Sequence, residues 1–255
     1  MKDFFINTLY IEEHGLDIGF SLYSAPHLIW LACMALFIAW MCIRYSKKDA
    51  SSRLQMKKTW ALVLAGSEVL KDTVLFVTGW FTPAYLPFHL CGLSIFAMLA
   101  DAYLPKQKLT KQMMLFAFMP GALSALLFSN WTEYPFYAYM SIHSFVFHAI
   151  IVGYTLMQFL GRDASPSYKG LWKTALAVVL VMIPVYGINI LFAEYNPNFM
   201  FLMEASPGSP LVPLWNIFGP KYYLFAGVGM IILVFHVLFP IYKGIEALQN
   251  KIAKK

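Results

Sequence analysis

The sequence predicts an all-α membrane protein with seven transmembrane helices, an outside N-terminus and a cytoplasmic C-terminus. Three observations support this. First, 60% of the 255 residues are hydrophobic and the mean hydropathy is +0.62, whereas soluble domains are about half apolar and more highly charged. Second, seven apolar stretches are long enough to cross ~30 Å of hydrocarbon, which takes ~20 helical residues. Third, most of the basic residues lie in every second connection between these stretches and in the C-terminal tail.

The seven predicted spans follow one another through short connections, except before the last. They cover residues 27–45, 58–79, 83–104, 112–129, 135–160, 172–193 and 222–243. The second, third, fifth and sixth also carry polar side chains, which are costly in hydrocarbon and usually face a bundle interior or a cavity.

The distribution of Lys and Arg sets the predicted orientation. Sixteen of the 19 lie on one side: Arg44, Lys47, Lys48, Arg53, Lys57, Lys58, Lys106, Lys108, Lys111, Arg162, Lys169, Lys173, Lys243, Lys251, Lys254 and Lys255. The opposite side has only Lys2 and Lys221, together with six acidic residues: Glu12, Glu13, Asp17, Glu133, Glu194 and Glu204. Because basic residues beside spans are retained in the cytoplasm, the basic side is predicted to be cytoplasmic. The net charge of +6 therefore reflects topology and anionic lipid, and we expect no nucleic-acid partner.

We expect one domain over residues 1–255, because little sequence lies outside the spans. Residues 1–26 form an outside segment without the pattern of a cleaved signal peptide, and residues 4–20 could form an amphipathic interfacial helix. The connection 194–221 is rich in Pro, Asn and Gly but also in large apolar residues. It is expected to fold over the bundle as a lid, since irregular backbone at membrane depth needs protein or a wet cavity beside it. An ordinary interfacial loop is the alternative.

The second span contains Glu68, Lys71 and Asp72. Spacings of i, i+3 and i+4 place these residues on one helical face, where they can partly neutralise one another. Two interpretations stay open: a self-satisfied ionic set that only fastens the helix, or the charged wall of a buried site.

Polar groups of other spans lie at a similar depth, a few residues inside the outer boundary. We therefore predict a cavity in the outer half of the bundle, covered by residues 194–221. Its expected lining is Glu68, Lys71, Asp72, His89, Cys91, His143, His148, Tyr186 and Asn189. Taken singly, each of these side chains is more typical of helix packing, because hydrogen bonds between helices are common in membrane bundles. Their common depth indicates a site.

The chemistry available at this depth is that of a thiol and an imidazole. A Cys thiolate is an intrinsic nucleophile, and a nearby His can accept its proton. Cys91 is therefore the candidate nucleophile, and either His143 or His148 the candidate base. A buried thiol without such a base is inert, so one of these histidines has to approach Cys91 across the bundle.

Other classes of site find little support. The sequence has no phosphate-binding loop, dinucleotide fingerprint, HExxH or paired CxxC pattern, and its His and Cys residues lack zinc spacing. We expect no metal and no cofactor. A haem held by His89 and His143 is the one alternative left open. The last span contains no internal Lys, so a retinal protein is not indicated.

Three segments carry a resemblance to a known family: PFHLCGLSIF (87–96), NPNFMFL (196–202) and GPKYYL (219–224). The chain resembles the YwaF-like family of bacterial seven-span membrane proteins, whose eukaryotic relatives are grouped with transmembrane protein 164. The resemblance covers nearly the whole chain. It implies acyl transfer on phospholipid by a membrane-embedded Cys with a His partner.

Transferred to this sequence, the resemblance makes Cys91 the nucleophile and His143 or His148 its partner. Glu68, Lys71, Asp72, His89, Tyr186, Asn189 and Asn198 are then the expected substrate contacts. We predict a multi-pass protein of the cell membrane that acts on phospholipid as an acyltransferase or acyl hydrolase. The alternative is a transporter or binding protein for a small polar or lipid-like solute, with no catalysis.

Overall fold

The computed structural model describes residues 2–6, 11, 14–104 and 107–253, and its regular structure is helical throughout. Several expectations lie outside these residues. They are the charges of Glu12, Glu13, Lys106, Lys254 and Lys255, and residues 7–10 and 12–13 of the interfacial helix expected within residues 4–20. Residues 14–20 are described and form turn and irregular structure, so the expected helix was wrong for them.

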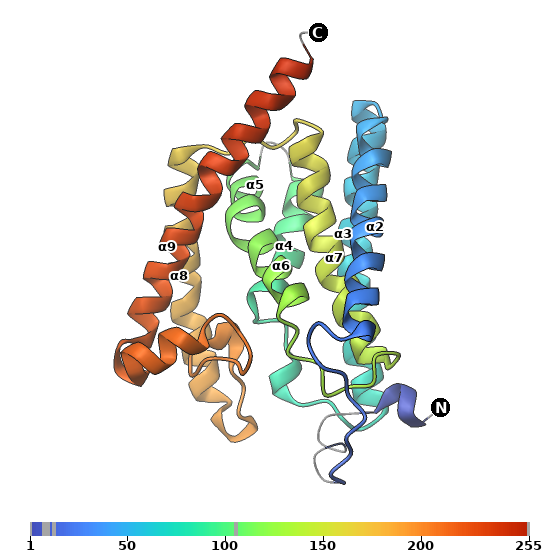
Figure 1. Ribbon diagram of the computed structural model, residues 1–255, viewed down its shortest axis with the longest axis vertical. Coiled ribbons are helices and arrows are strands. Elements are labelled where there is room, and N and C mark those ends of the chain that lie inside the picture. The colour runs from blue at the N-terminus through green and yellow to red at the C-terminus, as the bar shows by residue number, and fades with distance from the viewer. Residues whose placement is uncertain (1, 7–10, 12–13, 105–106, 254–255) are drawn as a thin grey trace.

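Long helices run side by side along the molecule, and each pass reverses the direction of the one before (Figure 1). They are α2 (Ala25–Ser46), α3 (Ala50–Val77), α4 (Leu90–Tyr103), α5 (Lys108–Met113) continued by η3 (Met114–Phe118) and α6 (Met119–Leu127), α7 (Tyr139–Leu160), α8 (Tyr168–Leu191) and α9 (Val212–Ile252). Short 3-10 turns are η1 (Lys2–Phe5), η2 (Pro83–Tyr85), η4 (Ala193–Tyr195) and η5 (Phe199–Phe201). The described residues thus form seven helical passes, one for each apolar stretch, and the all-helical class is confirmed.

Four helices, α2, α7, α8 and α9, are long and apolar enough by length and composition to cross a membrane. Helix α4 is apolar but has only 14 residues, and α3 carries the charged set of Glu68, Lys71 and Asp72. This composition identifies a membrane protein. Helix α7 is buried over most of its apolar length, whereas few residues of α9 are fully buried. The core therefore surrounds α7, between the α2–α3 pair and the α8–α9 pair (Figure 1).

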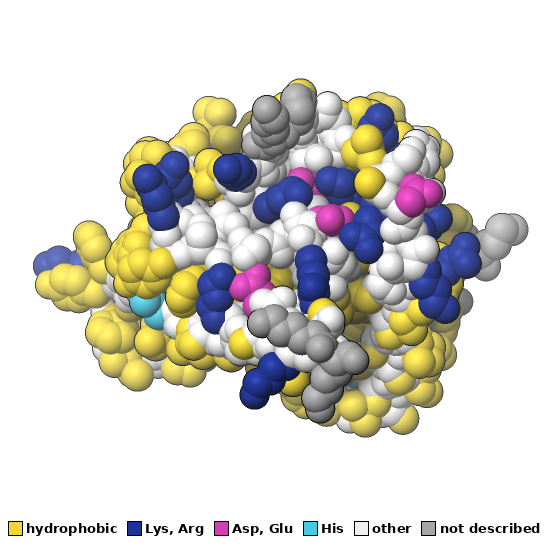
Figure 2. Space-filling view, turned by 90° about the horizontal axis from the view of Figure 1, so that it is seen from above, with side chains coloured by type: hydrophobic (Ala, Val, Ile, Leu, Met, Phe, Trp, Pro, Cys, Tyr) yellow, Lys and Arg dark blue, Asp and Glu magenta, His cyan; other side chains and the backbone are white. Residues whose placement is uncertain are grey.

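One end of the bundle collects the basic residues. Figure 2 looks down on the end where α2 and α7 finish and where α9 carries the C-terminus, and dark blue Lys and Arg side chains are scattered over it. The connections predicted to share one side of the membrane thus meet at one end of the molecule. The opposite end is formed by the starts of α4 and α7 and by residues 192–211, here called the α8–α9 connection.

The fourth pass changes its winding at Pro120. In an α-helix the carbonyl of Phe116 would need an N–H at position 120, which proline lacks. Residues Met114–Phe118 instead form a π-helix, in which Met119 donates its N–H to the carbonyl of Met114. With this spacing it is Leu115 whose carbonyl faces the proline, and the hydroxyl of Tyr242 on α9 donates to it at 2.7 Å. The π segment is therefore completed by a side chain from another helix.

Helix α9 begins earlier than the sequence predicts. Residues 212–218, expected to be part of the long outside connection, are helical. Gly219 then takes φ 64° and ψ 173° before Pro220, a backbone conformation that glycine adopts easily. The chain turns there, and the first part of α9 lies across the axis of the rest (Figure 1).

Candidate functional site

A cavity of about 730 Å³ opens at the end of the bundle opposite the basic one. Helices α3, α4, α6, α7, α8 and α9 and the α8–α9 connection all contribute to its walls, which are mostly apolar. Its volume is in the range of small-molecule sites, ~300–1,000 Å³. Six of the expected residues line it: Glu68, Lys71, His89, Cys91, His143 and His148. Residues 200–202 and 206–211 close one side of it, where the sequence predicts a covering segment.

Four expected substrate contacts do not line the cavity. Tyr186 is 39% exposed and faces outward from α8. Asp72 lies behind Lys71, with which it pairs at 3.2 Å. Asn189 and Asn198 bind the backbone of the α8–α9 connection. The expected lining was wrong for Asp72, Tyr186 and Asn189. Asp72 is turned toward Lys71 on α3, whereas α8, which carries Tyr186 and Asn189, is apolar on most of its circumference, so its sequence does not show which face turns inward.

Lys71 holds the charged set together. Its Nζ lies 2.5 Å from Oε1 of Glu68, 3.2 Å from Oδ1 of Asp72 and 3.0 Å from the carbonyl oxygen of Tyr85. An ammonium group has three N–H donors, and three oxygens surround this one. Removing Lys71 would therefore leave two carboxylates without their cation in a largely buried place.

Glu68 extends this set to α7. Its second oxygen, Oε2, lies 3.8 Å from Nε2 of His143, and both side chains are about nine-tenths buried. Nε2 of His143 has no hydrogen-bond partner among the described residues. The hydroxyl of Tyr139, one helical turn earlier, is also buried and unpartnered in this part of the chain. Unpaired buried polar groups are uncommon and call for an explanation such as a ligand or ordered water.

His148 is held in one orientation and one tautomer. Its Nδ1 lies 2.7 Å from the carbonyl oxygen of Ser144, and since a carbonyl can only accept, Nδ1 carries the proton. In the neutral ring Nε2 is then the acceptor. The ring stacks on Trp131, with centroids 5.0 Å apart and planes 13° apart. A fixed imidazole thus lines the cavity, and its Nε2 makes no hydrogen bond to another described residue.

His89 connects α4 to the α8–α9 connection. It is the N-cap residue of α4, its Nδ1 accepts the backbone N–H of Met200 at 3.3 Å, and its ring packs on Phe199 and Phe201. Met200 and Phe201 both have positive φ, 56° and 54°. Such values are uncommon for bulky residues, persist only when the surroundings impose them, and cluster at functional sites.

Cys91 is the second residue of α4. In the first turn of a helix the backbone N–H groups have no partner within the helix. Within the described part of the chain no hydrogen bond joins Sγ of Cys91 to a histidine. The thiol and the candidate bases thus line the same cavity without a hydrogen bond between them among the described residues.

The family of the chain is shown by comparison with known sequences. The sequence profile of the TMEM164 family matches residues 22–239. The chain belongs to the TMEM164 family. The match extends from just before α2 to residue 239 within α9 and so includes six passes and much of the seventh, and it confirms the resemblance to transmembrane protein 164. No curated protein and no solved structure matches the chain.

Sequence reasoning missed two parts of the cavity of this TMEM164-family chain. One is Trp131, which is 8% exposed and whose indole N–H lacks a partner among the described residues. Phe116, Ala117 and Pro120 of the π segment also line the cavity, and π segments often occur at functional sites. Pro120 within an apolar span was the available signal. No signal pointed to Trp131.

The described residues contain no group of three or more His, Cys, Asp and Glu side chains able to hold a metal ion. His89 already uses Nδ1 for the backbone of Met200, and His143 lies against Glu68. The features that could support chemistry in this family member are therefore a thiol, imidazoles and a charged set beside an apolar cavity.

Proposed function

We propose that this protein is a multi-pass enzyme of the cell membrane that transfers or hydrolyses the acyl groups of phospholipids, with Cys91 as nucleophile and His148 as base. The observation that supports this most strongly is that Cys91 and an imidazole of fixed tautomer line the same apolar cavity. A cavity with apolar walls and a few polar groups suits an acyl chain with an ester at its end.

The register of two helices supports the pairing. Tyr154 on α7 donates its hydroxyl to the carbonyl oxygen of Met98 at 3.3 Å and to Oδ2 of Asp101 at 2.8 Å, both on α4. The two helices run in the same direction and rise equally per residue. Counting back from these contacts, Cys91 lies at about the level of residues 144–147 of α7. His143 and His148 flank that level, which makes either ring a candidate partner for the thiol.

His148 is the better base, because Nε2 is its unprotonated nitrogen and Ser144 and Trp131 fix its ring. In the proposed step Nε2 takes the thiol proton and Sγ attacks the ester carbonyl carbon. The tetrahedral intermediate then expels the alcohol oxygen, which receives the proton from the imidazolium. The thioester left on Cys91 passes its acyl group to a lysophospholipid hydroxyl or to water. General acid–base assistance of this kind contributes typically ~10²–10⁴-fold.

The negative oxygen of that intermediate needs hydrogen-bond donors. Asn189 binds Phe199, Tyr186 faces outward, and Lys71 already has three oxygen partners. The first-turn N–H groups of α4, beside Cys91 and Gly92, are better placed. One donor in such a position is worth roughly 3–4 kcal/mol.

The proposal includes an orientation and a domain arrangement. With the basic end in the cytoplasm, the N-terminal segment 1–26 and the cavity face outward. A single seven-helix domain then receives lipid from the outer leaflet, and residues 194–221 act as a lid over the cavity. The contacts of His89 and Asn189 with residues 199–200 support the lid role.

Turnover of labelled phospholipid by the purified protein tests the proposal. Cys91→Ala and Cys91→Ser should abolish acyl transfer, whereas Cys42→Ala and Cys33→Ala, which change thiols of α2 outside the cavity, should leave it unchanged. His148→Gln should reduce the rate by at least about 100-fold. Activity that survives in Cys91→Ala would exclude the mechanism.

A second function is favoured by one observation, the absence of a hydrogen bond between Cys91 and a histidine in the described structure. A cavity that only binds a lipid-like solute needs no such bond, and buried charge sets also occur in carriers. A carrier would tolerate Cys91→Ser with little loss of binding or transport.

A further inference from the structure

The cavity that contains Cys91 has a polar part and an apolar part. Its charged and imidazole groups come from α3, α7 and the start of α4. In contrast, every described lining residue that η3, α8 and α9 contribute is apolar. This second part, here called the apolar arm, is lined by Phe116, Val178, Met182, Ile231, Val234 and Phe235. A cavity divided in this way suits a ligand with one polar and one apolar end.

The apolar arm extends from the outer end of the bundle toward the basic end. Helix α8 and the fourth pass begin at the basic end, and α9 finishes there (Figure 1). On these three helices the lining residues nearest the basic end are Val178, Phe116 and Phe235. Cys91, in the first turn of α4, lies at the outer end. A chain attached at Cys91 therefore enters the arm from its outer side and points inward.

Aromatic rings close the inner end of the arm. The ring of Phe116 contacts both Phe235 and Tyr242, which lie two turns apart on α9, with its centroid 5.8 Å from each of theirs. The ring of Phe159 on α7 packs against Tyr242 with centroids 5.0 Å apart. All four side chains are at most 3% exposed. These four residues, here called the aromatic floor, thus join three of the passes.

The aromatic floor is fixed in place by the backbone of the fourth pass. The hydroxyl of Tyr242 donates to the carbonyl of Leu115 at 2.7 Å, so this ring cannot move away without leaving a buried carbonyl unpaired. Phe116 belongs to the π segment next to Pro120, and its position depends on that winding. Because buried rings are closely packed, they yield to a ligand only at a cost. A ligand that reaches the floor therefore meets a rigid wall.

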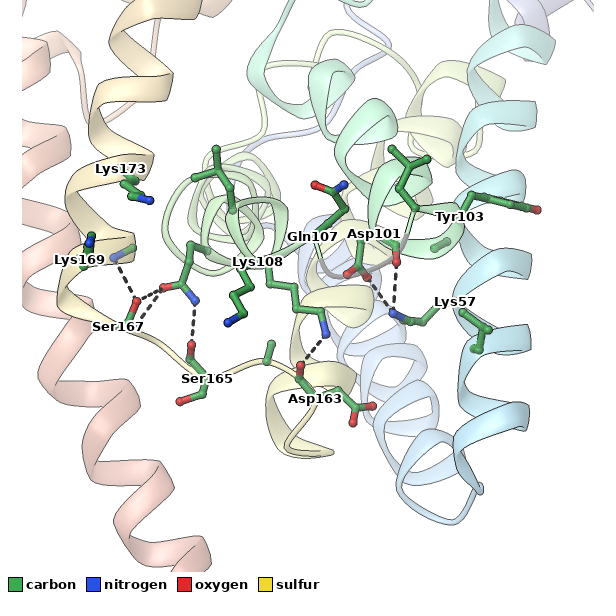
Figure 3. Close-up of a pocket in the computed structure, with 18 of the residues that line it drawn as sticks. Lys57, Asp101, Tyr103, Gln107, Lys108, Asp163, Ser165, Ser167, Lys169 and Lys173 are labelled. Carbon is green, nitrogen blue, oxygen red and sulfur yellow. Dashed lines mark hydrogen bonds and ion pairs between the residues drawn. The ribbon is translucent and has the colours of Figure 1, made fainter.

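A different environment begins beyond the aromatic floor. A second cavity, of about 920 Å³, lies at the basic end and shares no described lining residue with the first. Its lining is polar, as Figure 3 shows for Lys57, Asp101 and Lys108. On the fourth pass, Gln112 lines this second cavity and Phe116, one turn later, lines the apolar arm. Since methylene groups gain nothing in a polar space, the floor is the inner limit for an apolar ligand.

We propose that the apolar arm holds the acyl chain whose ester lies at Cys91, and that Phe116 and Phe235 set the longest chain that it accepts. The inference rests on the proposed function, because it places the ester at Cys91, and it adds a selection for chain length. A chain that ends above the floor fits the arm. Each methylene beyond that length is forced out of apolar surroundings, which changes the affinity about fourfold.

Two substitutions should move the length limit in opposite directions. Phe235→Ala removes a ring from the floor and deepens the arm, whereas Val178→Phe adds a ring at its inner end. The matched controls make the same changes at exposed positions: Phe225→Ala, where the residue is 77% exposed, and Val237→Phe, where it is 53% exposed. Thermal midpoints check that each variant is folded. If Phe235→Ala does not fold, Val178→Phe still decides the proposal.

The experiment measures binding separately from chemistry. For binding, each variant is made in the Cys91→Ala background, placed in nanodiscs and offered an equimolar mixture of saturated fatty acids from lauric to behenic acid. Native mass spectrometry then counts the chain lengths that are retained. For chemistry, the same variants with Cys91 intact are offered phospholipids that carry these acyl chains, and the thioester formed is identified by its mass.

We expect Phe235→Ala to retain longer chains than the parent protein and Val178→Phe to retain shorter ones. For two chains at the limit that differ by two methylenes, the ratio retained should change at least about tenfold. The controls should match the parent. Shifted binding without any thioester would reject the acyl transfer and keep the arm. An unchanged length preference in the folded floor variants, an equal shift in the controls, or no fatty acid retained by the parent would overturn the proposal.

Discussion

The amide side chain of Asn189 on α8 pairs with the backbone of Phe199 through two hydrogen bonds. Nδ2 donates to the Phe199 carbonyl at 3.1 Å, and Oδ1 accepts the Phe199 N–H at 2.9 Å. Both residues are at most 1% exposed. This pair fixes the segment that carries the positive φ angles of Met200 and Phe201 and thereby determines how the α8–α9 connection covers the cavity.

Replacing Asn189 with Leu should therefore loosen the connection without unfolding the bundle. Two buried backbone groups of Phe199 lose their partners, at a cost of about 1–3 kcal/mol. Hydrogen–deuterium exchange in residues 199–202 should accelerate by roughly 10–100-fold, while exchange in α7 stays unchanged. Tyr186→Phe, on the outer face of the same helix, is the control. Unchanged exchange of residues 199–202 in Asn189→Leu would show that the pair does not hold the lid.

The hydrogen bond from Tyr242 to Leu115 predicts a non-additive double mutant. Tyr242→Phe removes the donor to a buried carbonyl and should cost about 1–3 kcal/mol. Pro120→Ala restores an N–H that this carbonyl can bind. The cost of Tyr242→Phe should then fall by at least half in the Pro120→Ala background, as measured by chemical unfolding in detergent. Tyr222→Phe, an exposed tyrosine of α9, should have no effect in either background. If the changes in the free energy of unfolding from Tyr242→Phe and Pro120→Ala were strictly additive, Pro120 would not be the cause of the π segment.

The charged set predicts a second coupling. Lys71→Met leaves Glu68 and Asp72 without their cation, and breaking a buried ion pair in this way costs about 3–5 kcal/mol. The double variant Lys71→Met/Glu68→Gln removes the main stranded charge as well, so it should be more stable than Lys71→Met alone. Thermal unfolding of the two variants and the wild type decides this. A double variant less stable than Lys71→Met would argue that Glu68 depends on another partner, for which His143 is the candidate.

The proposed orientation can be measured directly. Reporter fusions after Ala50 and at the C-terminus should report cytoplasm, and a fusion after Ala205 should report the outside. Because the first two positions lie at the basic end and the third in the α8–α9 connection, the three fusions test the two ends of the bundle separately. A cytoplasmic signal at Ala205 would contradict the proposed orientation, because the cavity would then face the cytoplasm and take lipid from the inner leaflet.

Much of the fold could be predicted from the sequence, because apolar length and charge placement decide where membrane helices lie. Less of the candidate site could be predicted from the sequence. The i, i+3, i+4 spacing correctly brought Glu68, Lys71 and Asp72 together, since that contact is local. The roles of Asn189 and Tyr186 depend on how α8 is rotated, and an apolar helix does not show this in its sequence. The bond between Tyr242 and Leu115 depends on tertiary packing of segments 127 residues apart.

The central claim is that Cys91 forms a thioester with an acyl group taken from phospholipid. Its most direct test is intact mass measurement of the purified protein after incubation with labelled phospholipid, under conditions that preserve thioesters. The account predicts a mass increase of one acyl group on the wild type, mapped to Cys91, retained in Cys42→Ala and absent from Cys91→Ala. An acyl group on another residue, or turnover of the lipid by Cys91→Ala, would contradict it.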